Sequence, residues 1–178
     1  MKRFFAIITA VMMCAALMVP AVAAQEFMPS VTNKPAPEIV IARILDEDGE
    51  GTGLGVVGDL PEPLNASQAI ELVKERFSLE VVRTSRPVEG DIKTVAMCGG
   101  SGGSLIGAAK AAGAQLYISG DISYHNFFTQ EGFMLMDIGH YESEIEIVDI
   151  LFSLIRKKFP TFAVRITQNV NSNPIYYF

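Results

Sequence analysis

The chain has 178 residues, of which 49% are hydrophobic, enough to build one domain with a buried core and too many for a disordered chain. Its formal net charge is −6, and its Lys and Arg residues form no block or stripe. This argues against nucleic acid as a partner, because a surface that binds phosphates carries clustered positive charge. A negative charge of this size is ordinary for a small domain and identifies no substrate.

The first residues have the pattern of a secretory signal peptide. Lys2 and Arg3 give a basic start, residues 4–19 form an uncharged apolar run, and residues 21–24 supply the small side chains of a peptidase site. We expect residues 1–24 to be removed and the protein to be exported, with no stable membrane association after cleavage. The alternative is an uncleaved anchor, although the run is slightly short for a membrane span of about 20 residues.

Only two cysteines occur, Cys14 and Cys98. If residues 1–24 are removed, Cys98 has no partner, so the sequence predicts no intramolecular disulfide, even though a signal peptide implies an oxidising compartment. We interpret Cys98 as a small core residue. Cys14 follows Met13 within the apolar run, which makes a poor lipoprotein site and leaves lipid attachment as a minor alternative.

Residues 25–50 contain three prolines and an acidic run, and we expect a linker or extended segment there with one strand at 39–45. From residue 51 onward, strands alternate with helices in one domain that reaches residue 178. The pattern predicts a strand at 53–58, a turn at Pro61 and Pro63, a helix that begins at Asn65 or Ser67 and packs through Ala66, Ile70, Val73 and Phe77, strands at 79–82 and 92–97, and a glycine loop at 98–104. It then predicts a helix at 105–112 ended by Gly113, a strand at 115–119, a short helix at 122–130 capped by Asp121, a strand at 133–137, a helix at 141–159 ended by Pro160, and a strand at 162–166.

The helix at 141–159 carries an apolar stripe. Ile145, Val148, Phe152 and Ile155 recur at helical spacing, and we expect them to be core residues. On that interpretation, Phe152→Ala lowers the free energy of unfolding by about 3 kcal/mol or more.

The alternation of strands and helices indicates an α/β fold with a layered sheet, and with right-handed crossovers where neighbouring strands are parallel. In open α/β sheets, ligands bind beyond the carboxyl ends of the strands. Three segments are expected at that edge, namely residues 98–104, 120–121 and 137–140.

The chain has two histidines, His125 and His140. Glu144 follows His140 by one helical turn, which places an imidazole and a carboxylate on one face, where they can bind one metal ion. Spacing alone favours a surface histidine beside a first-turn glutamate, and the position of His140 after a strand brings the two interpretations level. His125 is open to three interpretations: a general acid/base, a partner of a metal ligand, or a core histidine, which the residues alone favour slightly.

The glycine loop at 98–104 also has two interpretations. Its N–H groups could hold an anion at the start of the following helix, although no Gly-Lys-Ser/Thr follows as in a P-loop. Asp121 lies near the distance at which a dinucleotide site places its acidic residue, but no ribose-binding context accompanies it. The alternative is a tight turn in which glycines allow close packing of strand and helix.

These motifs occur in an order that resembles a known family. Residues 95–104 (VAMCGGSGGS), 120–125 (GDISYH) and 137–144 (DIGHYESE) resemble the NIF-three-like dinuclear-metal proteins, also called GTP cyclohydrolase 1 type 2 homologues. Residues 53–61 and 171–174 resemble the start and the close of the C-terminal half of that family. The resemblance therefore implies the C-terminal half of the NIF-three-like α/β fold from about residue 51 onward.

The resemblance implies that His140 and Glu144 bind a divalent metal ion, such as zinc, manganese or iron, with His125 beside them as a catalytic acid/base residue. It also implies a homohexamer and a cytoplasmic location, which is the alternative to export. Family members carry an earlier half with a paired-histidine motif and a later aspartate ligand. No histidine precedes His125 in this chain, so we expect about half of a two-metal site.

Two classes of function follow. The first is a metal-dependent hydrolase of nucleotides or related small molecules, with an incomplete site. The second is a non-catalytic metal-binding or assembly module, as a gene fragment or a split gene would produce. The expected partners are further copies of this chain or a missing N-terminal half, with a small-molecule ligand and no nucleic acid. Metal-dependent activity that disappears on changing His140 would favour the first class.

Overall fold

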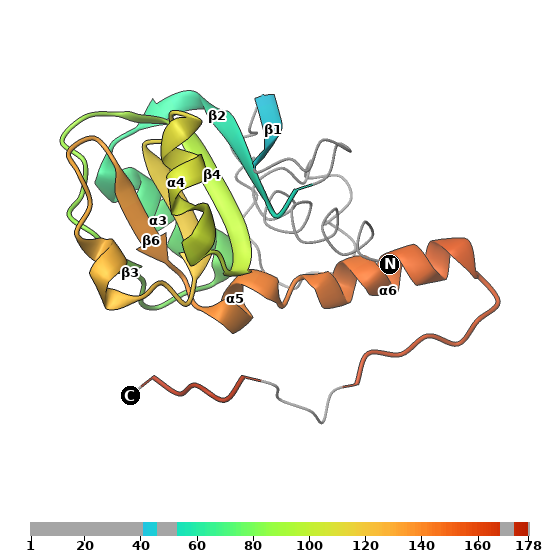
Figure 1. Ribbon diagram of the computed structural model, residues 1–178. Coiled ribbons are helices and arrows are strands. Elements are labelled where there is room, and N and C mark those ends of the chain that lie inside the picture. Colours follow the sequence, from blue (N-terminus) through green and yellow to red (C-terminus); the bar gives the residue numbers. More distant parts are fainter. Residues whose placement is uncertain (1–40, 46–52, 168–172, 178) are drawn as a thin grey trace.

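A six-stranded mixed sheet organises the chain in the computed structural model, which describes residues 41–45, 53–167 and 173–177 (Figure 1). The strand order is β1-β2-β4-β5-β6-β3, with β4, β5 and β6 parallel and the outer pairs antiparallel. This confirms the expected α/β class. The predicted signal peptide and most of the predicted linker lie outside the described residues.

The elements have the following bounds. The strands are β1 (Ile41–Leu45), β2 (Gly55–Leu64), β3 (Arg83–Thr84), β4 (Ile92–Ser101), β5 (Leu116–Gly120) and β6 (Met134–Asp137). The α-helices are α3 (Ala66–Phe77), α4 (Ile106–Ala111), α5 (His140–Glu144) and α6 (Ile147–Lys158). Two short 3-10 helices are η1 (Gly103–Leu105) and η2 (Tyr124–Phe127).

The core has two layers, one on each face of the sheet. Because side chains alternate along a strand, Leu116 and Ile118 face the layer that holds α3, while Tyr117 between them faces the layer that holds α4. The helices contribute mainly small side chains, such as Ala69 from α3 and Ala109 from α4, both buried. With both faces covered, β5 and β6 are buried along their whole length.

Helix α3 begins as predicted. Asn65 is its N-cap, because its side chain accepts a hydrogen bond from the backbone N–H of Gln68, and the Gln68 side chain accepts one from the N–H of Asn65. Ser67 lies inside the helix. Val73 is buried, and Phe77 packs partly buried against the core, so the predicted apolar face is confirmed.

Two strands extend further than predicted. Strand β2 continues through Pro61 and Pro63, where we expected a turn, because the pairing with β4 shifts between Asp59 and Leu64 and so needs no regular ladder there. Strand β4 continues to Ser101, so most of the predicted glycine loop is strand.

Two other strand predictions were wrong. The strand expected at 79–82 is displaced to Arg83–Thr84, where two residues pair with the end of β6. Residues 162–166 form no strand, and Phe162 and Ile166 are exposed there. A strand needs a neighbour with which to pair, and no strand of the described sheet pairs with this segment.

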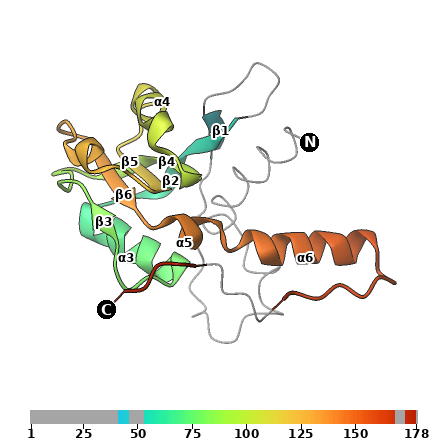
Figure 2. The ribbon, with the colours of Figure 1, turned by 60° about the horizontal axis from the view of Figure 1, so that its bottom comes forward.

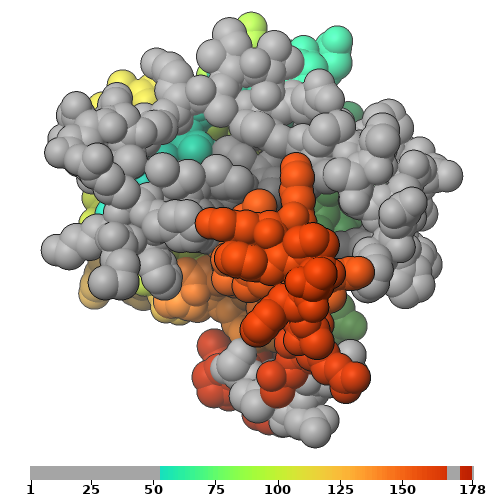
Figure 3. Space-filling view, turned by 90° about the vertical axis from the view of Figure 1, so that its right-hand side faces the viewer, coloured from blue at the N-terminus to red at the C-terminus, as the bar shows by residue number. Residues whose placement is uncertain are grey.

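The predicted long helix is divided at residues 145–146 into α5 and α6, and the core assignment of its stripe was wrong. No residue of α6 is buried, and Ile145 and Ile155 are 39% and 38% exposed. Both views of the ribbon show α6 extending away from the sheet (Figures 1 and 2), and its side chains form part of the surface in Figure 3. The reason is that α3 and α4 already cover the sheet. No helix in the described part of the chain is both long and apolar enough to cross a membrane.

This geometry revises the expected effect of Phe152→Ala. Phe152 is only partly buried, so its truncation should lower the free energy of unfolding by under about 1 kcal/mol. The matched control is Val73→Ala on α3, whose side chain is 2% exposed and whose truncation should cost about 2 kcal/mol. Urea denaturation of both variants measures the difference. An equal loss in the two variants would show that α6 packs against a core in solution.

Candidate metal site

The carboxyl ends of the parallel strands meet at one edge of the sheet, as predicted. At the end of β5, a Cβ on Gly120 would lie 2.8 Å from the carbonyl carbon and oxygen of Gly139 and 2.8 Å from the Cα of His140. The two backbones therefore touch directly, and only glycine fits between them. This contact places the start of α5, which follows β6, beside the end of β5.

His140 and Glu144 converge on one face of α5. Nε2 of His140 lies 3.3 Å from Oε2 of Glu144, and the two side chains are 47% and 41% exposed. For comparison, two ligand atoms of a tetrahedral zinc ion, each about 2.1 Å from the metal, are roughly 3.4 Å apart. The predicted spacing thus produces a pair of donor atoms at the separation that one metal ion requires.

Gly100 of β4 packs directly against this pair. Its φ is +64°, and a Cβ there would lie 2.5 Å from Oε1 of Glu144 and 3.3 Å from Cε1 of His140. The N–H of Gly100 donates a 2.8 Å hydrogen bond to Oγ of Ser143 on α5, which holds strand and helix together. A side chain at position 100 would therefore clash with Glu144 and press against the ring of His140.

Asp121 belongs to this site, and its predicted role as a helix cap was wrong. We expected it to cap the following helix, but the N-cap of η2 is Ser123, and the helix has no side-chain cap. Instead, Oδ2 of Asp121 lies 2.7 Å from Nδ1 of His140. Three side chains thus form one connected group, with the His140 ring between two carboxylates.

The hydrogen bond that the His140 ring donates to Asp121, aided by the charge of Glu144 and opposed by partial burial, raises the pKa of His140 above its ordinary value. A raised pKa means that the folded state binds the proton more tightly than the unfolded state does. The resulting stabilisation is complete below the unfolded pKa of about 6.5 and is lost as the pH rises through the folded pKa.

The glycine segment allows close packing. Its N–H groups at Gly100 and Gly102 donate to serine side chains, so they are not free to bind an anion. The N–H of Gly102 donates to Oγ of Ser119, and the hydroxyl of Tyr117 donates to the carbonyl of Gly102 at 2.7 Å. A Cβ on Gly102 would lie 2.2 Å from Oγ of Ser119. Of the two interpretations, the contacts support the close packing that glycines allow, although residues 98–101 are strand and not a turn.

Cys98 is buried on β4, as predicted, and its thiol donates to the carbonyl of Leu54 at 3.2 Å. Burial raises the pKa of this thiol to about 11, so it is protonated and unreactive at neutral pH.

Asp137, at the end of β6, links the segments that carry the site. Its buried carboxylate accepts hydrogen bonds from the N–H groups of Ile122 and Gly139 and pairs with Arg83 at 3.0 Å. These bonds hold together the segments that follow β5 and β6. From the sequence, Asp137 was expected only to lie at this edge of the sheet, and its hydrogen bonds to the neighbouring segments were not predicted.

His125 lies in η2, exposed to solvent, with its ring edge-on to Tyr124. The core interpretation of His125 was therefore wrong. Among the described residues, no hydrogen bond or ion pair joins it to His140 or Glu144. Its role as an acid/base residue stays a prediction.

The described residues contain no group of three or more His, Cys, Asp or Glu side chains arranged to hold a metal ion. Asp121 does not change this, because it contacts Nδ1 of His140 while Glu144 faces Nε2. The donor set fits a divalent ion as one imidazole and one carboxylate, which is a partial coordination shell.

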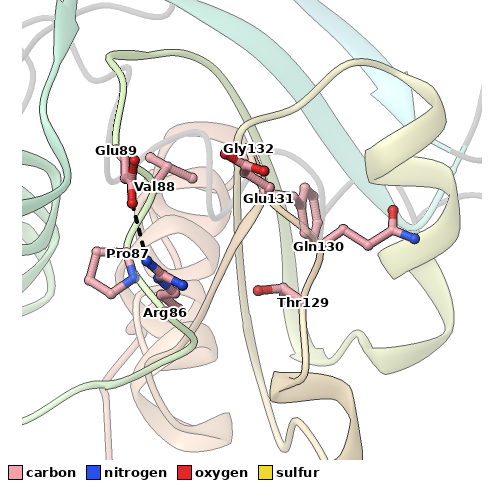
Figure 4. A pocket seen from close by; sticks show the side chains of 9 residues that line it. Arg86, Pro87, Val88, Glu89, Thr129, Gln130, Glu131 and Gly132 are labelled. Atoms are coloured by element: carbon pink, nitrogen blue, oxygen red, sulfur yellow. Dashed lines mark hydrogen bonds and ion pairs between the residues drawn. The ribbon is translucent and has the colours of Figure 1, made fainter.

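A separate hollow of about 210 Å³ lies between the segments that precede β4 and β6 (Figure 4). Because those segments join the amino ends of parallel strands, the hollow lies at the edge of the sheet opposite to His140. Its polar lining includes the exposed ion pair of Arg86 and Glu89, at 3.1 Å.

The model of the Duf34/NIF3 (NGG1p interacting factor 3) family matches residues 9–174 of this chain. The chain belongs to the Duf34/NIF3 family. The resemblance that the motifs carry is thus confirmed, and the match begins well before residue 51.

Curated relatives of this Duf34/NIF3 chain are named GTP cyclohydrolase 1 type 2 homolog. The one from Streptococcus pneumoniae is 37% identical over 110 residues, which cover 58% of this chain and 40% of the relative. The one from Staphylococcus epidermidis is 30% identical over 134 residues, which cover 70% and 35%. The chain therefore spans less than half the length of these relatives.

Solved structures of the family share the fold. A Staphylococcus aureus protein has a TM-score of 0.62 at 27% identity, and the match covers 72% of this chain and 38% of the Staphylococcus aureus chain. A Bacillus cereus protein related to NIF3 has a TM-score of 0.59 at 26% identity, with coverage of 75% and 38%. These similarities establish the Duf34/NIF3 fold for the described part of the chain.

Proposed function

We propose that this chain provides part of a divalent-metal site, with Nε2 of His140 and the carboxylate of Glu144 as ligands. The observation that carries the proposal is the 3.3 Å separation of these atoms, next to Gly100, which packs so closely against Glu144 that a Cβ there would clash with its carboxylate. The metal would be zinc, manganese or iron, all of which accept imidazole and carboxylate ligands. When bound, such an ion polarises a substrate oxygen or lowers the pKa of a bound water.

The reaction class that we propose is metal-dependent hydrolysis of a small molecule, with His125 as the candidate acid/base residue. The name of the curated relatives, GTP cyclohydrolase 1 type 2 homolog, supports this class. This chain matches less than half of their length, and the proposal needs further metal ligands beyond His140 and Glu144. In this scheme His140 and Glu144 bind the ion, and the backbone contact at Gly120 fixes where they stand.

The second candidate is a non-catalytic metal-binding or assembly module. The exposed apolar side chains of α6 favour it, because an apolar stripe on a helix normally packs against a protein core or another polypeptide. The occupant would be further copies of this chain or a polypeptide equivalent to the unmatched part of the relatives. Export by residues 1–24 remains part of the proposal for location, with the cytoplasm as the alternative.

Calorimetric titration with zinc and manganese tests the metal proposal. The chain alone should bind weakly, well below the roughly 10–16 kcal/mol of closed structural zinc sites, because it supplies two ligands. His140→Ala should remove the binding. The matched control is Glu142→Gln on the same helix, whose carboxylate accepts a hydrogen bond from Asn173 and lies against Gly139, away from the pair. Unchanged binding in His140→Ala would make His140 an ordinary surface histidine.

A further inference from the structure

The two nitrogens of the His140 ring face two different carboxylates. Nδ1 lies 2.7 Å from Oδ2 of Asp121, whereas Nε2 lies 3.3 Å from Oε2 of Glu144. Both carboxylates can only accept a hydrogen bond, and a neutral imidazole has one N–H to donate. The shorter contact favours Asp121 as the acceptor, and therefore the form of the ring that carries its proton on Nδ1. In that form the lone pair is on Nε2, directed at Glu144, which is the arrangement that a metal ligand needs.

The backbone at Asp121 indicates that this contact is a specific one. Its φ is +52°, a left-handed conformation that glycine adopts freely and other residues adopt at a cost of about 1–2 kcal/mol. Among the described residues that are not glycine, only Ser78 shares it, and Ser78 ends helix α3. Asp121 ends no helix, because it lies between β5, which ends at Gly120, and η2, which begins at Tyr124.

We propose that Asp121 is a positioning residue for the metal site: its carboxylate holds the His140 ring with the proton on Nδ1 and with Nε2 turned toward Glu144. The proposal rests on the metal-binding function proposed above. Carboxylates that hydrogen-bond to a metal-ligating histidine fix its proton and orientation, and their loss typically weakens metal affinity by about 10–100-fold. Asp121 thus contributes to binding without contacting the ion.

Asp121→Gly is the sharpest variant, because glycine adopts a positive φ without strain. Its melting temperature should equal or exceed that of the unchanged chain, while its zinc affinity, measured by calorimetry, falls about 10–100-fold. Asp121→Asn, whose side-chain oxygen still accepts a hydrogen bond from Nδ1, should recover part of the loss. An Asp121→Gly variant with full zinc affinity would overturn the positioning role while leaving the metal site intact.

A metal-free measurement tests the same proposal independently. The chain has two histidines, so ¹⁵N-resolved NMR of the imidazoles, followed to a pH at which both rings are neutral, reports both tautomers, with exposed His125 as the internal reference. His140 should carry its proton on Nδ1, and Asp121→Gly should shift the proton toward Nε2, where Glu144 remains as the acceptor. If His140 carries its proton on Nε2 in the unchanged chain, the proposal fails whether or not zinc binds. If zinc binding survives His140→Ala, the proposed function fails instead.

Discussion

Gly120→Ala is expected to lower the free energy of unfolding by about 2–3 kcal/mol, measured by urea denaturation. The added Cβ would lie 2.8 Å from three backbone atoms of Gly139 and His140, and backbone atoms at the end of a buried strand cannot move aside as a flexible side chain can. The end of β5 and the start of α5 would have to separate. The same variant should also weaken zinc binding, because His140 moves with the strand end.

The matched control is Gly107→Ala in α4, where a Cβ would meet nothing within 4 Å. Alanine favours a helix interior over glycine by about 0.5–1 kcal/mol, so this variant should be neutral or more stable. Equal stability of the two variants would show that the strand ends are not in contact in solution.

Supplying the unmatched part of a relative, for example from the Streptococcus pneumoniae protein, should raise the zinc affinity of this chain at least about tenfold, or about 1.4 kcal/mol. The physical reason is the number of ligands. Stable metal sites usually take three or four protein ligands or complete their shell with water, and the described residues offer two. The added polypeptide can be fused or mixed with the chain, and calorimetric titration measures the gain.

His140→Ala should abolish this gain, while Glu142→Gln should retain it, because the carboxylate of Glu142 lies off the His140–Glu144 face and contacts Asn173. A gain that persists in His140→Ala would show that the added part binds zinc by itself and that the metal assignment in this chain is wrong.

The central part of the fold was predictable because its signals are local. Strands β4, β5 and β6 are short apolar runs between turn residues, and Asn65 with Gln68 forms a capping box within one turn. Strand β3 was misplaced because its two residues are defined by their pairing with Asp137 and Met136, more than fifty residues away. Helical periodicity predicted that α6 has an apolar side but not which part of the molecule covers it.

The candidate site divides in the same way. His140 and Glu144 are one turn apart, so their spacing alone predicted a shared face. Asp121 is nineteen residues from His140, and an aspartate before a short helix is usually a cap, which is why its contact was missed. Gly100 belonged to a recognised glycine run, but its place beside Glu144 depends on how β4 packs against α5.

The closeness of His140 and Glu144 in sequence has a consequence for how metal acts on folding. Two ligands four residues apart remain neighbours in the unfolded chain, which can therefore chelate an ion weakly before any sheet forms. Affinity for the unfolded state subtracts from the stabilisation that a ligand confers on the folded one. Zinc should consequently raise the melting temperature by less than its affinity for the folded protein implies. Asp121 and Gly100 join the pair only in the folded sheet. The rise in melting temperature that zinc does produce therefore reports how much the folded surroundings of the pair add to its metal affinity.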